Sequence, residues 1–264
     1  MNEKKNLALL CDYGMDDAIG TLYLFEHAHQ FNKIDIVAIG GNFPLKQTLI
    51  NAKRIITHYN GKLDNVTVVD TSSIAQPEEI LADIHGEDGM GDLLPQDYNE
   101  DITVLDYDEW LEGIDDNYVI VSLGPCTVTI DILEKKGSLP LIMMAGNINE
   151  PPNYKGYEFN HGMDIQAFAK CVKYPHAAAT LDTCHCPACN LNLHELPKEG
   201  MFAKMLARYR DMSRGRGEEI CSVYDLTALV YLTHPQRFES AVMEDKDGNP
   251  VNVLKYISQI PVFL

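Results

Sequence analysis

The sequence lacks any uninterrupted apolar run of about 18 or more residues, so no membrane-spanning helix is expected. Positive charge is also scarce, because 21 Lys and Arg residues stand against 39 Asp and Glu residues, a formal charge of −18. Such a surface repels phosphates and anionic lipid, which argues against binding to nucleic acid or membranes. Tryptophan occurs once, at Trp110 among acidic residues, and we expect it to serve in packing.

The composition is that of a globular protein, with 45% hydrophobic and 23% charged residues. Disordered and collagen-like chains are excluded on this ground. The seven cysteines are odd in number and scattered, and the N-terminal residues show no signal-peptide pattern. Both features predict reduced thiols and a cytoplasmic protein.

Short apolar runs alternate with stretches of helical periodicity. The runs that predict buried parallel strands are 6–11, 34–39, 66–69, 118–123 and 139–144. The predicted helices are 16–30, 46–59, 77–84 and 128–136, then 164–172, 200–212 and 225–232, with a hairpin turn at 247–249. This alternation predicts an α/β fold with a doubly wound, mostly parallel sheet and helices on both faces. Because no linker or repeat divides the chain, we expect one domain over residues 1–264.

Polar residues follow these strands at the points where the strands end. Asp12, Asp16 and Asp17 follow the first strand, and Asn42 follows the second. In an open parallel sheet, ligands bind beyond the carboxyl ends of the strands. We therefore expect residues from separate segments to meet there in one site.

The loop of residues 11–18 places three carboxylates within six positions, where a strand passes into a helix. Helix capping accounts for one or two of them, because Asp accepts backbone N–H bonds at a helix start. A third raises the electrostatic repulsion, which a cation relieves. Ca²⁺ takes six to eight oxygen ligands, often from Asp, so metal binding is favoured over capping alone.

This acidic loop resembles the Asp-x-Gly-x-Asp-Asp-Ala signature of the Ca²⁺-dependent, inosine-uridine preferring nucleoside hydrolases. Six further motifs of that family occur in the same order. They are Gly41-Asn42, His85-Gly86, Leu123-Gly124-Pro125-Cys126-Thr127, Met144 with Gly146, Glu158-Phe159-Asn160 followed by Asp164, and Tyr224-Asp225. The resemblance covers most of the chain and implies a nucleoside hydrolase-like domain.

The activity implied is hydrolysis of the N-glycosidic bond of a ribonucleoside, or a close ribosyl analogue, to the free base and ribose. The partner would be a small nucleoside, the role purine or pyrimidine salvage, and the assembly a homodimer or homotetramer. The glycosyl transition state is an oxocarbenium-like cation. A cup of carboxylates stabilises that cation more than the neutral substrate.

The family's site residues carry over to the matching positions. The implied Ca²⁺ ligands are Asp12, Asp17, Asp225 and the main-chain carbonyl of Thr127. Asp12 is also the implied base that takes a proton from the Ca²⁺-bound water. The implied ribose contacts are Asp16, Asn42, Glu158 and Asn160, with Met144 packing nearby and Asn153 as a further contact. His85 and Tyr224 are the implied catalytic residues on the side of the departing base.

Three positions depart from the family pattern. Leu10 stands where the family has a supporting Asp, and Tyr13 replaces the usual Pro or Thr. Tyr224 replaces a histidine that protonates the departing base. A phenol with a pKa near ~10 is a weaker acid at pH 7 than an imidazole near ~6.5.

These departures leave an alternative, a protein of the same fold that binds a ribosyl ligand and Ca²⁺ with weak or no catalysis. An aspartate-nucleophile phosphatase is disfavoured, because residues 10–14 do not supply the Asp-x-Asp that this chemistry needs.

The segment Cys184-His185-Cys186-Pro187-Ala188-Cys189 contains the usual zinc ligands. Its spacing lacks a second Cys pair, although His194 or Cys171 could supply a further ligand. A redox Cys-x-x-Cys pair at Cys186 and Cys189 would be expected at a strand-to-helix start, which the sequence lacks here. Reduced structural cysteines are favoured over both a zinc site and a redox pair, and the choice stays open.

Overall fold

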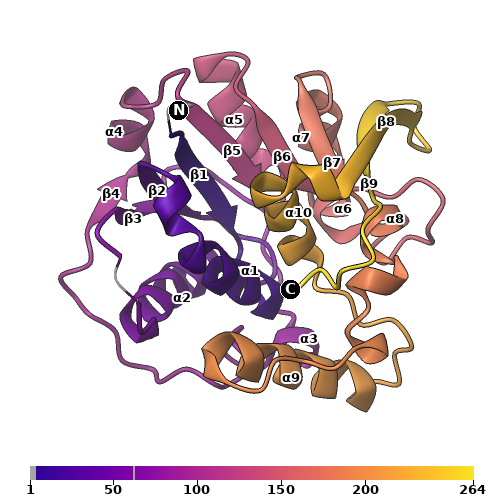
Figure 1. Cartoon of the computed structure of the whole chain (residues 1–264). Helices are drawn as coiled ribbons and strands as arrows, with labels where there is room; N and C mark the ends of the chain where they lie inside the picture. Colours follow the sequence, from indigo (N-terminus) through magenta and orange to yellow (C-terminus); the bar gives the residue numbers. More distant parts are fainter. Residues whose placement is uncertain (1–3, 62) are drawn as a thin grey trace.

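A nine-stranded sheet forms the centre of the part that the structure describes, residues 4–61 and 63–264 of a computed structural model (Figure 1). The strand order is β4-β3-β2-β1-β5-β6-β7-β9-β8. The strands are β1 (Asn6–Cys11), β2 (Lys33–Ala38), β3 (Val66–Asp70), β4 (Val104–Asp106), β5 (Tyr118–Ser122), β6 (Leu141–Met144), β7 (His176–Ala179), β8 (Phe238–Glu244) and β9 (Pro250–Tyr256). Only the β8–β9 pair is antiparallel, so the predicted doubly wound, mostly parallel sheet is confirmed.

Helices cover both faces of this sheet (Figure 1). They are α1 (Met15–Glu26), α2 (Leu45–His58), α3 (Ala82–His85), α4 (Tyr107–Glu112), α5 (Thr127–Lys136), α6 (Phe159–Met163), α7 (Ile165–Cys171), α8 (Leu181–Cys184), α9 (Gly200–Gly215) and α10 (Tyr224–Thr233). Within the described ranges, no helix combines the length and the apolar character needed to traverse a bilayer.

The central strand β1 shows why the strands of this sheet are continuous apolar runs in the sequence. Leu7 and Leu9 pack into a core with α1, α2, α9 and α10, whereas Ala8 and Leu10 face a second core with α4, α5 and α7. Successive side chains of a strand point to opposite faces, and both faces here are covered by helices. Trp110 lies in the second core, where its Nε1 donates to Asp35 Oδ2 at 2.9 Å, which confirms its packing role.

The helix predicted over residues 77–84 is wrong, because only α3 at its end is helical. The residues before α3 run beside the loop after β2. Glu79 N donates to Gly41 O at 2.8 Å, and Leu81 N donates to Asn42 O at 3.1 Å. In a helix over 77–84, Leu81 N would instead donate to the carbonyl of Pro77, so its bond to Asn42 O replaces a bond of the helix.

The sequence-based prediction also misses β4, β7, β8 and β9. The β7 strand reads His-Ala-Ala-Ala, which lacks the β-branched and aromatic residues typical of strands. The predicted hairpin turn is confirmed: it joins β8 to β9, and Asp245 N donates to Asn249 O at 3.0 Å.

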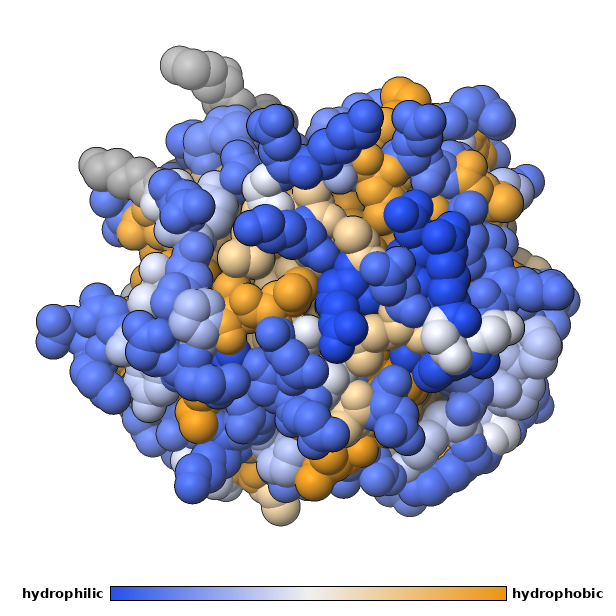
Figure 2. Space-filling model, turned by 90° about the horizontal axis from the view of Figure 1, so that it is seen from below, coloured by the Kyte–Doolittle hydropathy of each residue, from blue (hydrophilic) through white to orange (hydrophobic). Residues whose placement is uncertain are grey.

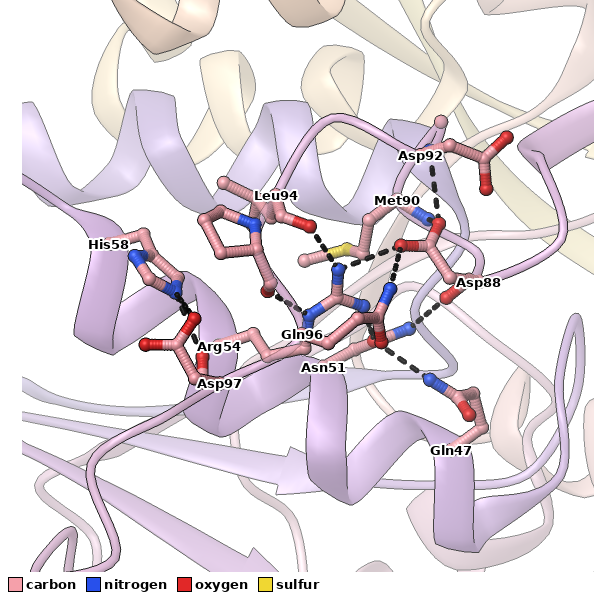
Figure 3. A network of polar contacts seen from close by, with 12 residues as sticks. Gln47, Asn51, Arg54, His58, Asp88, Met90, Asp92, Leu94, Gln96 and Asp97 are labelled. Atoms are coloured by element: carbon pink, nitrogen blue, oxygen red, sulfur yellow. Dashed lines mark hydrogen bonds and ion pairs between the residues drawn. The ribbon is translucent and has the colours of Figure 1, made fainter.

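A buried ion pair fastens the loop after α3 to helix α2 (Figure 3). Arg54, with no exposed surface, donates to Asp88 Oδ2 at 2.7 Å, Leu94 O at 2.6 Å and Pro95 O at 2.8 Å. Asn51 accepts another bond from Arg54 and donates to Asp88 O. The guanidinium therefore holds the loop that begins at the end of α3, next to the site described below.

Candidate active site

A cavity of about 650 Å³ opens at the carboxyl ends of the central strands. Strand β1 lies between β2 and β5, the switch point at which ligands bind in such sheets. Nine of the predicted site residues line the cavity: Asp16, Asn42, His85, Met144, Asn153, Glu158, Asn160, Tyr224 and Asp225. Figure 2 views the side on which α3 and α9 lie, where hydrophilic side chains dominate and hydrophobic areas are small and separate.

Three buried carboxylates form a cluster beside this cavity. Asp16 and Asp17 lie in the first turn of α1, and Asp225 lies in the first turn of α10. One oxygen of each lies within 4.8 Å of the others. Asp17 caps α1 by accepting from Gly14 N at 2.8 Å, but its other oxygen and Asp16 Oδ1 are buried without a hydrogen-bond partner. Capping therefore explains only part of the acidic loop.

Asp12 is fully buried just after β1, and its carboxylate is closely surrounded by the backbone of neighbouring loops. Its Oδ2 accepts from Asn42 N at 2.7 Å, and its Oδ1 accepts from Asn42 Nδ2 at 3.3 Å. A Cβ at Gly41 would lie 2.0 Å from Asp12 Oδ2, and one at Gly124 would lie 2.8 Å from its Cγ. Both glycines are thus required for the carboxylate to occupy this place.

Burial raises the pKa of Asp12, Asp17 and Asp225 above ordinary values, and the charge of neighbouring carboxylates raises it further. Three carboxylates buried this close together cannot all stay charged unless a proton or a cation offsets their charge. The donors are all oxygen, and two of the oxygens lack a partner, a combination that fits a hard divalent cation.

Glu158, which directly precedes α6, accepts hydrogen bonds from three backbone N–H groups, two at the start of α6 and one in the loop after β6. Its Oε1 accepts from Asn160 N at 2.9 Å, and its Oε2 accepts from Gly146 N at 2.8 Å and His161 N at 3.0 Å. Burial nevertheless raises the pKa of Glu158 to about 7. Asn160 Nδ2 donates to Leu123 O and Met144 O, both at 2.9 Å, so its amide is fixed between β5 and β6.

His85 lies at the end of α3 and reaches the acidic loop. Its Nδ1 accepts from Met15 N at 3.1 Å, so the proton of the neutral ring is on Nε2. The same Nδ1 lies 3.7 Å from Asp16 Oδ1, beyond hydrogen-bond distance. Burial lowers the pKa of His85, which favours this neutral form.

Tyr224 begins α10, and its hydroxyl lies 3.3 Å from His185 Nε2. Burial raises the pKa of the Tyr224 phenol above its ordinary value. His185 Nδ1 lies 2.7 Å from Glu150 Oε2. Tyr224, His185 and Glu150 thus form a hydrogen-bonded row at one wall of the cavity, and the first two line it.

The sequence model of the inosine-uridine preferring nucleoside hydrolases matches residues 7–254. This chain belongs to that family. Its members act on N-glycosyl bonds, so the predicted class of enzyme is confirmed. No curated protein matches the sequence.

Solved structures of nucleoside hydrolases share this fold. A purine-preferring ribonucleoside hydrolase from Gardnerella vaginalis has a TM-score of 0.68 at 19% identity, over 98% of this chain and 95% of that one. An inosine-uridine preferring nucleoside hydrolase from Bacillus anthracis has a TM-score of 0.68 at 13% identity, over 98% and 96%. An inosine-guanosine nucleoside hydrolase has a TM-score of 0.69 at 16% identity, over 96% and 88%.

Three of the predicted site residues of this nucleoside hydrolase do not line the cavity. Asp12 and Asp17 are fully buried beneath it, next to residues that do. Thr127 begins α5, and its hydroxyl donates to Asp164 Oδ2 at 2.7 Å, so the side chain is directed to α7. The role assigned to Thr127 concerns its main-chain carbonyl and stays a prediction.

Sequence reasoning missed His185 as a cavity residue, and Arg216 lines the cavity as well. The Cys-x-Cys surroundings of His185 suggested a zinc ligand, whereas its partner Glu150 lies 35 positions away and carries no motif. Arg216, at the end of α9, pairs with Glu218 and donates to Asp83 O of α3 at 3.0 Å. The contacts of His185 with Glu150 and of Arg216 with Asp83 join distant segments, so neither leaves a local signal in the sequence.

The zinc alternative for the cysteine segment lacks a ligand set. Among the described residues, the groups of His, Cys, Asp and Glu close enough to hold an ion are the acidic cluster and the trio of His161, Asp245 and Asp247. Tyr13 is fully buried, with its hydroxyl 3.4 Å from Thr21 Oγ1, so its ring packs in the core and not in the site.

Proposed function

We propose that this chain hydrolyses the N-glycosidic bond of a ribonucleoside to the free base and ribose, acting as one domain over residues 1–264. The observation that carries the proposal is the buried cluster of Asp16, Asp17 and Asp225 beside a cavity that also holds Glu158 and Asn160. The volume of about 650 Å³ suits a ligand of nucleoside size.

Asp12, Asp17, Asp225 and the Thr127 carbonyl would hold a Ca²⁺ ion. Asp12 is not one of the three residues whose oxygens lie within 4.8 Å of one another, so in this assignment it takes the place of Asp16. When bound, the ion supplies positive charge that offsets the carboxylates and makes a water easier to deprotonate. Asp12 takes the proton from the attacking water, and the hydrogen bonds from Asn42 N and Nδ2 hold its carboxylate in place for that role.

The carboxylate side of the cavity binds the ribose. Asp16, Asn42, Glu158 and Asn160 present oxygen and nitrogen atoms to its hydroxyl groups. The backbone bonds to Glu158 hold its charge in place before the reaction, so little reorganisation is needed as the sugar becomes an oxocarbenium-like cation.

His85 and Tyr224 act on the base. The neutral His85 ring retains its Nε2 proton as a hydrogen-bond donor, and the Tyr224 hydroxyl provides a second. Either bond stabilises negative charge that develops on the departing base.

The test is release of reducing sugar from a panel of purine and pyrimidine ribonucleosides, before and after chelation and after addition of Ca²⁺. We expect hydrolysis of at least one nucleoside, loss of it with the chelator and recovery with Ca²⁺. Hydrolysis that persists fully in chelator would refute the Ca²⁺ assignment. The absence of sugar release from every nucleoside and from an activated riboside would refute hydrolysis.

The second candidate is a ribosyl-binding protein with weak or no catalysis. The raised pKa of Tyr224 supports it, because that phenol is a poor proton donor at pH 7. Calorimetric binding of ribose or a nucleoside in Ca²⁺, together with no turnover in the assay above, would favour this candidate. Location in the cytoplasm, the salvage role and a homodimer or homotetramer remain predictions.

A further inference from the structure

Two cysteines outside the proposed chemistry bring their sulfur atoms together. Cys186 Sγ lies 3.2 Å from Cys189 Sγ, at the two ends of a short 3₁₀ turn. Cys189 N donates to Cys186 O at 3.0 Å, so the backbone itself holds the two residues close. A disulfide has an S–S distance of about 2.05 Å, so bond formation needs an approach of only about 1.2 Å.

The two thiols are unequal in a way that suits exchange chemistry. Cys186 is partly exposed, whereas Cys189 is buried. The hydrogen bond with Cys189 lowers the pKa of Cys186, and the thiolate is the nucleophile in exchange. Cys186 can therefore react with a reagent from solvent, whereas Cys189 is shielded from it.

We propose that Cys186 and Cys189 form a reversible disulfide by exchange with a small-molecule disulfide. The Cys186 thiolate attacks one sulfur of the reagent, which breaks the reagent's S–S bond and releases one thiolate. Cys189 then loses its proton and attacks the Cys186 sulfur, which releases the second thiolate. The protein loses two electrons and two protons, and the reagent leaves as two thiols.

A second pair of thiols in this chain offers a matched contrast. Cys126 and Cys171 interact through their side chains, but both are fully buried. Burial and contact with Cys171 raise the pKa of Cys126 well above its ordinary value. Neither thiol of this second pair is accessible from solvent, so a small disulfide should leave both reduced.

The Cys186–Cys189 pair lies next to the wall of the proposed active-site cavity. Cys186 directly follows His185, which lines the cavity and contacts Tyr224. Thr227 on α10 lies 3.9 Å from Cys189 Sγ, so the pair joins the loop after α8 to the helix that begins with Tyr224. The inference is independent of the proposed hydrolysis, since its readout needs no substrate.

The experiment equilibrates the full-length native protein with graded mixtures of reduced and oxidised glutathione. Free thiols are then alkylated, and the protein is digested and measured by mass spectrometry. We expect a peptide in which Cys186 and Cys189 are joined, lighter by two hydrogens, whose fraction follows the glutathione ratio and returns to zero with reductant. Cys126 and Cys171 should be alkylated only after denaturation.

The variant Cys189→Ser separates the first exchange step from the second, and Cys171→Ser is its control. With Cys189→Ser, Cys186 should accumulate a mixed disulfide with glutathione, whereas Cys171→Ser should leave the 186–189 bond unchanged. The proposal is overturned if wild-type Cys186 keeps the mixed disulfide with Cys189 free. It is equally overturned if Cys186 stays unmodified at every ratio, or if the 126–171 pair oxidises in preference.

Discussion

Asp12 is the residue on which the proposed chemistry depends most. Replacing it by Asn keeps the size of the side chain and the acceptor for Asn42 N, but removes the base and one negative charge. We expect kcat for the best nucleoside to fall about 10²–10⁴-fold, the usual contribution of a general base, with little loss of stability. The measurement is reducing-sugar release together with thermal unfolding.

The matched control for that variant is Asp108→Asn, which changes an exposed Asp of α4 far along the chain. It should leave kcat unchanged. Near-normal turnover of Asp12→Asn would show that another group activates the water.

In the proposed reaction, Tyr224 decides how readily natural bases depart. Because burial raises the pKa of its phenol, proton transfer to the base is weak, and substrates that need a proton should react slowly. We expect p-nitrophenyl riboside, whose leaving group is a stable phenolate, to be cleaved much faster than inosine or uridine. Tyr224→Phe should change the rate on p-nitrophenyl riboside only slightly.

The measurement is kcat/KM for both types of substrate in wild type and variant. Equal rates on inosine and p-nitrophenyl riboside in the wild type, falling together in Tyr224→Phe, would contradict this account of the departing base.

Residue types and their order allowed most of the candidate site to be predicted, because nine of the predicted residues do meet at one cavity. The row from Glu150 through His185 to Tyr224 was not predictable. Its members come from three separate segments, and only packing of α8 against α10 brings them together.

At the scale of elements, helix α2 and the loop after α3 are joined by Arg54 and Asp88 (Figure 3). Removing one partner of a buried pair leaves the other charge without compensation, at a cost of about 3–5 kcal/mol. We expect Asp88→Asn to lower the free energy of unfolding by about 3 kcal/mol, measured by urea denaturation at pH 7.

The control is Glu134→Gln, which breaks the Glu134–Lys170 pair, where both side chains are about half exposed. An exposed pair is worth about 1 kcal/mol or less, so this variant should be close to wild type. Equal destabilisation by both substitutions would show that burial of the Arg54–Asp88 pair does not matter.

The Arg54–Asp88 pair also predicts a dependence on pH. Burial alone would raise the pKa of Asp88, but hydrogen bonds from Arg54, Met90 N and Asp92 N lower it overall. A carboxylate whose pKa is lowered by folding stabilises the protein at any pH above its unfolded-state pKa, which is near ~3.9. This stabilisation is lost as the pH falls through the folded-state pKa. The difference in unfolding free energy between wild type and Asp88→Asn should therefore be largest at neutral pH and shrink below about pH 4.

A difference between wild type and Asp88→Asn that stays constant from pH 7 to pH 3 would assign the effect to packing and not to charge. Urea denaturation at several pH values measures it.

At the scale of the whole molecule, the acidic cluster links α1 to α10, two helices packed on one face of the sheet. A ligand that binds only the folded state at 100 times its Kd stabilises by about 2.7 kcal/mol. We expect chelation to lower the Tm and Ca²⁺ to restore it, as followed by thermal unfolding. Asp225→Asn should respond to neither, and an identical Ca²⁺ response of that variant would place the ion elsewhere.

The sequence by itself determined the parallel core strands, because short apolar runs bounded by Gly or Asp are typical of strands buried on both faces. It also determined the acidic loop, because its three aspartates are close together in the chain before it folds. Tertiary structure alone decided that the Ala-rich segment of β7 is a strand, since β6 and β9 pair with it on either side. It also decided that residues 77–81 are not helical, because the carbonyl of Asn42 accepts from Leu81 N, an N–H group that a helix over 77–84 would have used. Contacts between distant segments carry no local pattern, so they arise only when the chain has folded.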